Sequence, residues 1–467
     1  MISFENIGLI EPLQRAITEA NYRHMTPIQA KAIPPLLDGK DVMGCAQTGT
    51  GKTAAFLLPV IQKLMTSPRP KRWGIRALIL SPTRELAAQI DENLSIYSKY
   101  LRLSHLVIFG GVSQKPQVEM LERGVDILVA TPGRLLDLHR QGFITFDKIE
   151  FFVLDEADCM LDMGFIHDIK KVLAKLPSKR QNLLFSATMP KPIVDFAHTF
   201  LHTPVSVEVA PQSTTAEKIQ QSVMFVERAN KKRLLAHILT TFDIESAIVF
   251  TRTKHGANRV VKDLGKVGVE ALAIHGNKSQ GARTRALDAF KSRMICVLVA
   301  TDIAARGIDV SGVSHVFNYD LPNVSETYVH RIGRTARAGR AGIAIAFCDE
   351  SESEYLRKIE ELIGQSIDIH SEHEWHYPEA IPKPKEPKRR RSHKKPSSHQ
   401  SRQRATTDKT PRRGDSKKKG KQKVSIHPRD QESRSKESNK SDDANKTSAP
   451  RKSRRRRPRR IGSSSKP

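Results

Sequence analysis

Residues 46–53, AQTGTGKT, combine two glycines, a lysine and a threonine at a spacing that can hold phosphate groups. Lys52 can neutralise phosphate oxygens, and the hydroxyl of Thr53 can bind Mg²⁺. Backbone N–H groups from about Thr48 to Lys52 and the start of the following helix would face the phosphates. Ala46 stands where the strict pattern has its first glycine, and a purely structural turn before a helix is the alternative.

A second chemical pattern lies about a hundred residues further on, where the apolar run of FFVLDEAD (151–158) ends in adjacent carboxylates. Because side chains alternate along a strand, Asp155 and Glu156 would point apart. Asp155 can then bind Mg²⁺, directly or through water, while Glu156 orients and deprotonates an attacking water. An acidic pair after a strand can also be a helix N-cap. Together with the upstream loop, the pair predicts hydrolysis of a nucleoside triphosphate.

Arginines gather in HRIGRTARAGR (330–340), with Arg306 upstream. Arg334 and Arg337 are three residues apart, which would place them on one side of a helical turn among small residues. Basic runs are often solvated surface, which is the alternative here. A guanidinium delivered across a cleft to the γ-phosphate would act as an arginine finger. The candidate catalytic residues are therefore Lys52, Asp155, Glu156, Arg334 and Arg337.

Short apolar runs alternate with helical periodicity along the chain, which is typical of parallel strands joined by crossover helices. The first series comprises 77–81, 105–109, 126–130, 151–155 and 182–186; the second comprises 247–251, 270–274, 295–301, 315–319 and 343–347. We therefore expect an α/β fold with two tandem parallel-sheet domains. Their predicted bounds are 1–208 and 219–370, with a polar linker at 209–218 and a basic tail at 371–467.

Most of the net positive charge of the chain lies in its C-terminal segment. Residues 381–467 hold 32 Lys and Arg against 8 Asp and Glu, a net +24, whereas residues 1–380 hold 46 against 42. This segment has scarcely any large apolar residue and therefore cannot bury enough surface to offset its ordering entropy. We expect it to be disordered.

The four cysteines, Cys45, Cys159, Cys296 and Cys348, contain no C-x-x-C pair, which disfavours a zinc site and a disulfide framework. The N-terminus has no basic residue before its apolar stretch, and no run of about 18 apolar residues occurs. We expect a soluble cytoplasmic protein without a membrane partner.

The chain from about Phe4 to about Leu362 resembles the DEAD-box RNA helicases, because eleven of their motifs occur in the family's order. The sequences of these motifs are most similar to those of the bacterial RhlE-like group. The resemblance implies two RecA-like domains and the cofactors ATP and Mg²⁺. The motifs are TPIQ (26–29), AQTGTGKT (46–53), PTRELAAQ (82–89), GG (110–111), TPGR (131–134), DEAD (155–158), SAT (186–188), VFTRT (249–253), QGAR (280–283), ATDIAARGID (300–309) and HRIGRTARAGR (330–340).

The resemblance also implies roles for single residues in the ATP site. Gln29 would read the adenine edge and Phe4 would stack on the ring, although a packed aromatic is an equal alternative for Phe4. Asp309 would touch the ribose, and the residues that couple closure to hydrolysis would be Asp158, Ser186, Thr188 and His330. The implied ATP-binding set is Phe4, Gln29, Ala46, Gln47, Thr48, Gly49, Thr50, Gly51, Lys52, Thr53 and Asp309, with Thr53 and Asp155 on Mg²⁺.

An RNA-binding surface follows from the same resemblance. Its implied residues are Thr83, Arg84, Gly110, Gly111, Thr131, Gly133, Arg134, Arg252, Thr301 and Gly307, some of which could simply terminate strands. The chain departs from the family at Asn21 and Tyr22, where Gly and Phe are common, and at Ala336, where Gly is frequent. None of these three differences from the family removes a residue with a predicted catalytic role.

The expected function is an ATP-dependent RNA helicase that melts short duplexes through sequence-independent backbone contacts. An ATP-gated RNA clamp that assembles ribonucleoprotein is the alternative. The sequences of the TPIQ and DEAD motifs disfavour a DNA helicase. The basic tail would tether RNA electrostatically, or only solubilise the chain. We expect a monomer whose partners are RNA and, as candidates, ribosomal precursors or RNA-decay proteins.

Overall fold

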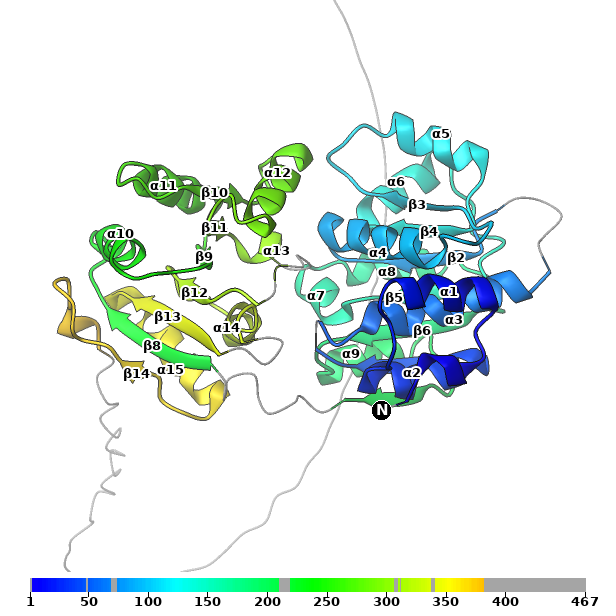
Figure 1. Cartoon of the computed structure of the whole chain (residues 1–467), viewed down its shortest axis with the longest axis horizontal. Coiled ribbons are helices and arrows are strands. Elements are labelled where there is room, and N and C mark those ends of the chain that lie inside the picture. The colour runs from blue at the N-terminus through cyan, green and yellow to red at the C-terminus, as the bar shows by residue number, and fades with distance from the viewer. Residues whose placement is uncertain are drawn as a thin grey trace, which may run out of the picture. The chain divides into compact units, whose positions relative to one another are not determined.

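The computed structural model describes residues 2–47, 49–68, 74–209, 219–305, 310, 312–336 and 341–381. These residues form two α/β lobes, each built on a seven-stranded sheet (Figure 1). The strands within each sheet are parallel, so each needs a crossover connection to the next. The predicted two-domain α/β fold is confirmed.

The first lobe covers residues 2–209 and has the strand order β3-β4-β2-β5-β6-β1-β7. Its strands are β1 (Val42–Cys45), β2 (Ala77–Leu80), β3 (His105–Ile108), β4 (Ile127–Ala130), β5 (Phe151–Leu154), β6 (Gln181–Ser186) and β7 (Val205–Glu208). Its helices are η1 (Phe4–Ile7), α1 (Glu11–Glu19), α2 (Pro27–Leu37), α3 (Lys52–Thr66), α4 (Arg84–Tyr97), α5 (Lys115–Arg123), α6 (Pro132–Arg140), α7 (Ala157–Asp162), α8 (Ile166–Leu173) and α9 (Lys191–Ala197).

The second lobe covers residues 219–381 and has the strand order β10-β11-β9-β12-β13-β8-β14. Its strands are β8 (Ile219–Phe225), β9 (Ala247–Phe250), β10 (Ala271–Ile274), β11 (Val297–Ala300), β12 (His315–Asn318), β13 (Gly342–Cys348) and β14 (Asp368–Ile369). Its helices are α10 (Lys231–Thr241), α11 (Lys254–Gly265), α12 (Gln280–Lys291), α13 (Asp302–Ala305), α14 (Ser325–Ile332), η3 (Glu350–Glu352), α15 (Ser353–Ile363) and η4 (Pro378–Ala380).

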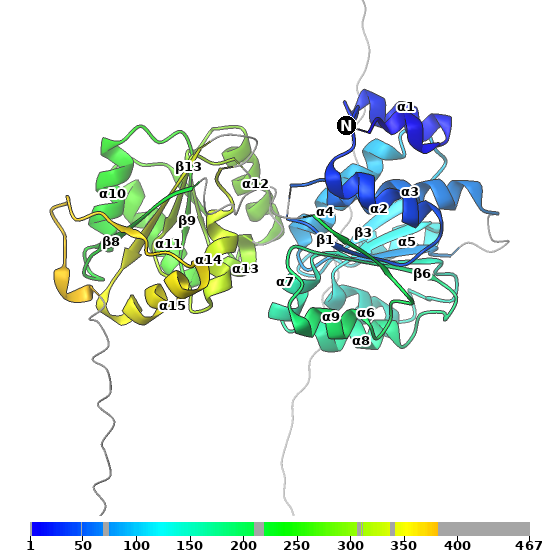
Figure 2. The ribbon, with the colours of Figure 1, turned by 90° about the horizontal axis from the view of Figure 1, so that it is seen from below.

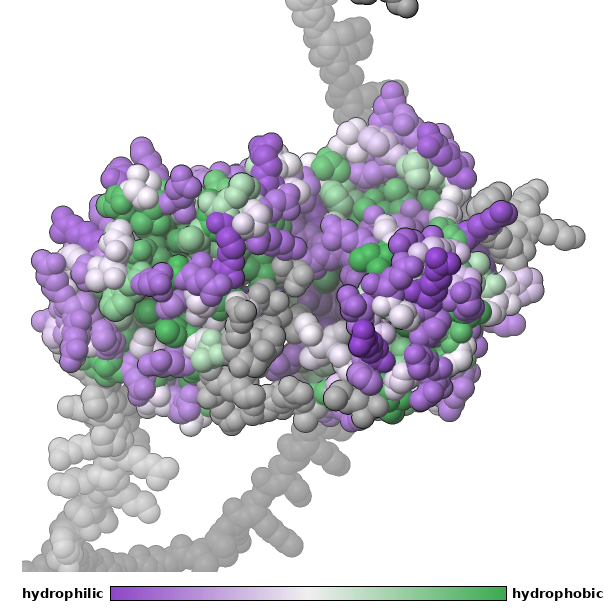
Figure 3. Space-filling view, viewed as in Figure 1, coloured by the Kyte–Doolittle hydropathy of each residue, from purple (hydrophilic) through white to green (hydrophobic). Residues whose placement is uncertain are grey.

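Each sheet is buried on both faces, which explains why its central strands are apolar throughout. In the first lobe α1–α4 contribute to the core on one face and α6–α9 to the core on the other (Figure 2). In the second lobe α10 and α11 cover one face, and α12–α15 cover the other. Hydrophilic side chains predominate over α1 on the face shown in Figure 3, as expected for a helix with one apolar stripe.

Every one of the ten predicted apolar runs contains a strand. The sequence prediction missed β7, β8 and β14. Strand β8 escaped notice because Gln220, Gln221 and Ser222 interrupt its apolar pattern, and only part of it is buried. Strand β14 has two exposed residues and therefore carries no hydrophobic pattern at all.

The packed part of the second lobe extends past residue 370, where the second domain was predicted to end. Tyr377 N donates to Phe225 O at 3.0 Å, and His376 forms an antiparallel bridge with Val226. Residues 371–381 thus continue the fold beside β8. The rest of the predicted tail and residues 210–218 of the predicted linker lie outside the described residues. Within those that are described, no helix is long and apolar enough to cross a membrane.

Candidate functional site

The phosphate-loop candidate lies at the carboxyl end of β1 and leads directly into α3, as predicted. Gly49 and Gly51 have φ values of 83° and 95°, a left-handed conformation that glycine adopts without a Cβ clash. The hydroxyl of Thr50 donates to Gln47 O at 2.6 Å and closes the turn. Thr48 lies outside the described residues. The loop therefore has the tight turn and following helix that phosphate binding needs.

Ala46 continues the pairing of β1 with β6 before the loop turns away. Its N–H donates to Ser186 O at 3.0 Å, and its side chain is only 1% exposed within the apolar core. The methyl group thus fills core space and does not obstruct the loop. This placement explains why alanine is compatible with the position where the strict pattern has glycine.

Lys52 is the first residue of α3 and is only 6% exposed. Its Nζ has no hydrogen-bond partner within the described part of the chain. Its charge acts on two nearby carboxyls: it opposes the rise that burial causes in the pKa of Asp155, and it helps to hold the pKa of Asp158 below its usual value. A buried ammonium is costly unless it is paired and hydrogen-bonded. The position of Lys52 therefore suits an anionic ligand.

The carboxylate pair follows β5 directly. Glu156 has a φ of 51°, an uncommon value for a residue with a Cβ, and its N–H donates to Asp155 Oδ1 at 3.0 Å. Glu156 occupies the N-cap position of α7, yet its side chain makes no capping hydrogen bond. The N-cap alternative therefore does not account for its carboxylate. Burial raises the pKa of Asp155 to about 7, although Lys52 opposes this rise.

The first lobe brings three of the four predicted coupling residues together. Asp158 Oδ2 accepts from Thr188 N and Thr188 Oγ1, both at 2.9 Å, while Asp158 N donates to Ser186 Oγ at 3.1 Å. Burial alone would raise the pKa of Asp158, but Lys52 and the hydrogen bond from Thr188 hold it below its usual value. Asp158 thus connects the end of β5 to the end of β6. The fourth residue, His330, lies on α14 of the second lobe.

Gln29 binds backbone groups in this structure. Its Oε1 accepts from Thr26 N at 2.8 Å, its Nε2 donates to Gly51 O at 3.2 Å, and it is 1% exposed. It therefore ties α2 to the phosphate loop. Phe4 is also 1% exposed and packs edge-on against Tyr22, so the packed alternative describes it and no ring face is open for stacking. Tyr22 lines the same hollow as Gly51 and Lys52, a placement the sequence prediction missed.

The predicted RNA-binding residues of the first lobe share the carboxyl edge of the sheet. Thr83 and Thr131 are the N-cap residues of α4 and α6. Gly111 has a φ of 77°, and a Cβ there would clash with the guanidinium of Arg84, so glycine permits this close approach. The residues lining one hollow at this edge include Thr83, Arg84, Gly110, Thr131, Gly133 and Arg134.

The second lobe corrects the predicted helical placement of Arg334. Helix α14 ends at Ile332, and Arg334 lies in the turn beyond it, where Thr335 bridges to Val313. Arg331, by contrast, is 1% exposed and binds both carboxylate oxygens of Asp302, at 2.5 and 2.8 Å. It therefore has a structural role. Arg306, Gly307, Asp309, Arg337 and Arg340 lie outside the described residues.

Thr301 and Arg252 follow the ends of β11 and β9. The carbonyl of Thr301 accepts from Ala304 N and Ala305 N, both at 2.9 Å, and so starts α13. The side chain of Arg252 is 38% exposed and binds Glu352. Both predicted RNA-binding residues thus lie at the carboxyl edge of the second sheet, where ligands of open α/β sheets bind.

The residues present fit a magnesium ion bound mainly through phosphates and water. The described residues contain no group of three His, Cys, Asp or Glu side chains that could hold a metal. Mg²⁺ commonly uses one or two carboxylates together with substrate phosphates, so a protein cage is not required. Asp155, buried beside the phosphate loop, and Thr53, at the start of α3, are the available ligands.

Two family models match successive parts of the chain. The DEAD/DEAH box helicase model matches residues 26–196, and the helicase conserved C-terminal domain model matches residues 230–339. The first lies within the lobe that carries the phosphate loop, and the second lies within the lobe that carries Arg252 and Arg334.

Curated relatives of similar length support this class. The chain is 45% identical over 363 residues to the ATP-dependent RNA helicase CshA of Listeria monocytogenes, covering 77% of this chain and 69% of the relative. It is 44% identical over 368 residues to the DEAD-box ATP-dependent RNA helicase CshA of Geobacillus kaustophilus, covering 79% and 78%. The chain therefore belongs to the family of DEAD-box ATP-dependent RNA helicases. The RhlE-like placement stays a prediction.

A solved relative has the same two-lobed architecture. S. cerevisiae Dbp5 bound to RNA and ADP BeF3 is 33% identical, with a TM-score of 0.69, and the match covers 79% of this chain and 94% of Dbp5. The RecA-like fold expected from the family motifs is thereby confirmed.

Proposed function

We propose that this helicase couples ATP binding and hydrolysis to the local separation of short RNA duplexes. The first lobe would hold one ATP molecule, and arginines of the second lobe would complete the ATP site. The observation that carries this proposal is the buried Nζ of Lys52, which has no hydrogen-bond partner among the described residues and lies at the start of α3. Dbp5, a structural relative, is described as bound to RNA and ADP BeF3.

In the proposed mechanism Lys52 neutralises the terminal phosphates. Asp155 and Thr53 would hold Mg²⁺, which supplies further positive charge at the phosphates. Glu156 orients the attacking water and takes its proton as the water oxygen bonds to the γ-phosphorus. The bond from the γ-phosphorus to the β,γ-bridging oxygen breaks, so that ADP and phosphate leave. Arg334 and Arg337 stabilise the charge that develops on the transferred phosphoryl group.

The polar chain from Asp158 to Ser186 and Thr188 supports a role in coupling. Asp158, two residues after Glu156, is joined to Ser186 and Thr188 by three hydrogen bonds within the first lobe. A change at the phosphates can therefore reach the end of β6 through Asp158. His330 would join this chain when the lobes close around ATP and RNA.

RNA would be gripped through sugar and phosphate, because the predicted contacts are threonines, glycines and arginines at the carboxyl edges of the two sheets. Such contacts position a strand without reading its bases. The hydroxyls and exposed N–H groups can also meet the 2′-hydroxyl, which distinguishes RNA from DNA. Single-stranded RNA should therefore stimulate ATP turnover, whereas DNA of the same sequence should not.

The decisive experiment replaces Arg334 and Arg337 together by glutamine and measures RNA-stimulated ATP turnover. We expect kcat to fall by about 10³-fold or more, the usual effect of an arginine finger, with ATP affinity changed only a few-fold. The matched control is Arg259→Gln, at an exposed arginine of α11. Unchanged turnover in the double variant would refute the two-lobe site.

Duplex separation must be measured directly. We expect strand release from a short RNA duplex in the presence of ATP, faster than spontaneous melting. If the chain instead holds RNA for long periods with a non-hydrolysable ATP analogue and releases strands no faster than buffer does, it is an ATP-gated RNA clamp and the unwinding proposal fails.

A further inference from the structure

The two sheets place a lysine at equivalent positions. Strand β1 occupies the same place in the first sheet as β8 does in the second, since each is the sixth strand in the order. The helix after β1 begins with Lys52, and the helix after β8 begins with Lys231. The fourth strands of the two sheets, β5 and β12, also each lead to an aspartate: Asp155 follows β5 directly, and Asp320 follows β12 after Tyr319. The second lobe therefore retains the framework of a phosphate site.

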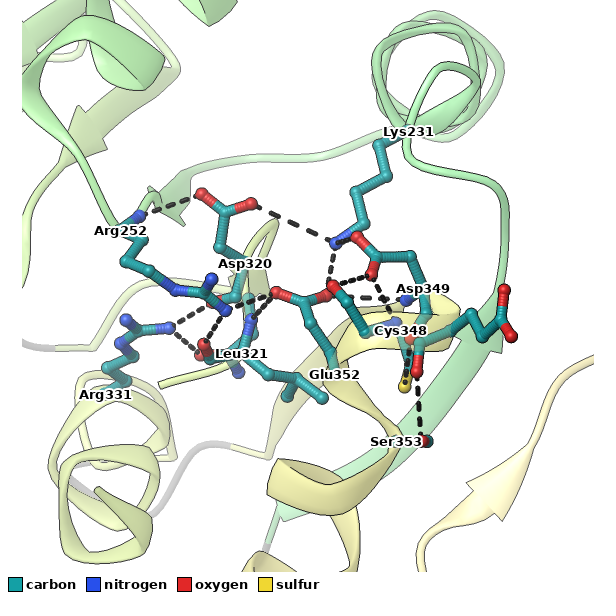
Figure 4. Close-up of polar contacts among 12 residues, drawn as sticks. Lys231, Arg252, Asp320, Leu321, Arg331, Cys348, Asp349, Glu352 and Ser353 are labelled. Atoms are coloured by element: carbon teal, nitrogen blue, oxygen red, sulfur yellow. Dashed lines mark hydrogen bonds and ion pairs between the residues drawn. The ribbon is translucent and has the colours of Figure 1, made fainter. Parts of the chain in front are cut away.

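The surroundings of the two lysines differ. Lys231 has a side chain that is 0% exposed and forms ion pairs with three carboxylates, whereas Lys52 Nζ has no hydrogen-bond partner among the described residues. The carboxylates are those of Glu352, of Asp349 at 3.1 Å, and of Asp320 at 4.0 Å (Figure 4). Negative charge of the chain itself thus occupies the place that corresponds to the phosphates in the first lobe.

Glu352 also contacts Arg252, at the carboxyl edge of the sheet. Its Oε2 faces Lys231, and its Oε1 accepts from the Arg252 guanidinium at 2.7 Å and from Leu321 N at 3.1 Å. The guanidinium also donates to Leu321 O at 3.1 Å, and Arg252 N donates to Asp320 Oδ2 at 2.9 Å. The side chain of Glu352 is 2% exposed, whereas that of Arg252 is 38% exposed. A buried carboxylate therefore anchors a surface guanidinium.

We propose that Glu352, fixed by Lys231, is a positioning residue that holds Arg252 in the orientation in which it binds the RNA backbone. This inference rests on the proposed function, because it assumes that Arg252 contacts RNA. Arg252 has a long side chain whose conformational freedom would otherwise be lost on binding. The fixed carboxylate removes much of that cost in advance. The residues of the second lobe that correspond to the phosphate site of the first lobe would thus increase the affinity for RNA and would not bind a second nucleotide.

The test is a double-mutant cycle between Glu352→Gln and Arg252→Gln in the full chain. For each variant, ATP turnover is measured against the concentration of a single-stranded RNA, which gives the concentration for half-maximal stimulation, the maximal kcat and the KM for ATP. We expect Glu352→Gln to raise the half-maximal RNA concentration about tenfold, as for the loss of a charge-assisted hydrogen bond, with kcat and KM for ATP nearly unchanged. In the Arg252→Gln background it should add almost nothing.

The control is Glu354→Gln, which makes the same charge change two residues away on α15, where the side chain is 67% exposed. It should behave as the original chain does. Because removing one partner of a buried ion pair can destabilise a fold, the cycle is repeated with Lys231→Met added to Glu352→Gln, which removes both charges. Thermal unfolding of every variant shows whether the second lobe remains folded.

Two failures can be told apart. If Arg252→Gln raises the half-maximal RNA concentration and Glu352→Gln does not, or if their effects are additive, the positioning role is wrong while the proposed RNA contact stands. If Arg252→Gln itself leaves the half-maximal RNA concentration unchanged, the assignment of Arg252 to the RNA surface is wrong and the positioning role falls with it.

Discussion

Replacing Gly51 by alanine tests whether the phosphate loop depends on its contact with Gln29. Gly51 has a φ of 95°, and a Cβ at this position would lie within 3.0 Å of Gln29 Nε2 and at 3.1 Å from Thr26 Oγ1. Gln29 is buried between α2 and the loop and so cannot yield without losing contacts. Its side chain must therefore move away from the backbone groups of Thr26 and Gly51 that it now binds.

The magnitude follows from two contributions. A left-handed backbone costs an alanine about 1–2 kcal/mol. Displacement of Gln29 breaks two hydrogen bonds, each contributing about 0.5–1.5 kcal/mol. We therefore expect the free energy of unfolding of the first lobe to fall by about 2–5 kcal/mol, and the Kd for ATP to rise, because the loop loses the glutamine that holds it against α2.

The control is Gly39→Ala. Gly39 has a similar φ of 80°, but a Cβ there would meet nothing within 4 Å. This variant should lose only the backbone contribution, about 1–2 kcal/mol, and should bind ATP normally. Chemical denaturation and titration with a fluorescent ATP analogue give both quantities for both variants. If Gly51→Ala matches Gly39→Ala in stability and in ATP affinity, the contact with Gln29 has no energetic importance and the reasoning fails.

Four further predictions follow from the same structure and sequence. Ala336→Gly should stabilise the chain by about 1 kcal/mol in denaturant melts, because Ala336 has a φ of 53°. Asn21→Gly, at a φ of 63°, should change the stability little, since asparagine tolerates this conformation. Equal effects of the two substitutions would argue against strain at Ala336. Thr188→Val should cost about 1.5–3 kcal/mol at pH 7. Because the folded pKa of Asp158 is lowered, its contribution is present above the unfolded pKa of about 3.9 and lost as pH falls through the folded value, so the deficit should shrink in melts at pH 2–3; a constant deficit would contradict the assignment. Burial raises the pKa of Asp155 to about 7, so more of this carboxyl is protonated at pH 6 than at pH 8. Because a metal ligand must be deprotonated, the Mg²⁺ concentration for half-maximal turnover should be higher at pH 6 than at pH 8. If that concentration does not change with pH, Asp155 is not a ligand. Deleting residues 382–467 should leave basal ATP turnover intact and raise the RNA concentration needed for stimulation, an effect that should vanish at high salt; no change at physiological salt would reject a tethering role for the basic segment.

The sequence predicted the strands that read as continuous apolar runs, including the partly exposed β3 and β10, and missed strands whose apolar run is short or interrupted. Runs such as 77–81 and 151–155 are apolar throughout because helices cover both sides of the sheet. Strand β7 alternates between partly buried and exposed residues over only four positions, a pattern too short to distinguish from a loop. The hydrophobic pattern therefore located strands by their apolar runs, whether at the centre of a sheet or at its edge.

For the candidate site, the sequence predicted which residue types lie at the strand ends but not how their side chains are engaged. The positions of Lys52, Asp155 and Asp158 follow from their place next to β1 and β5. The packing of Phe4 against Tyr22, by contrast, depends on a contact across 18 residues of sequence that no local pattern reveals. Lys231 was missed because a lysine at the start of a helix is usually a surface residue. Its burial follows only from the three carboxylates that converge on it.

Residues with a Cβ in the left-handed conformation include Glu156, which is proposed to activate water, and two of the family departures. Glu156, Asn21 and Ala336 have φ values of 51°, 63° and 53°. At Asn21 and Ala336 the family frequently has glycine, so the positive φ gives a physical reason for that preference. Glu156 cannot be exchanged for glycine without losing the carboxylate that is proposed to activate water. The strain at Glu156 is therefore retained by the chemistry, whereas the strain at Ala336 is removable, which is why only the latter is expected to yield stability when replaced.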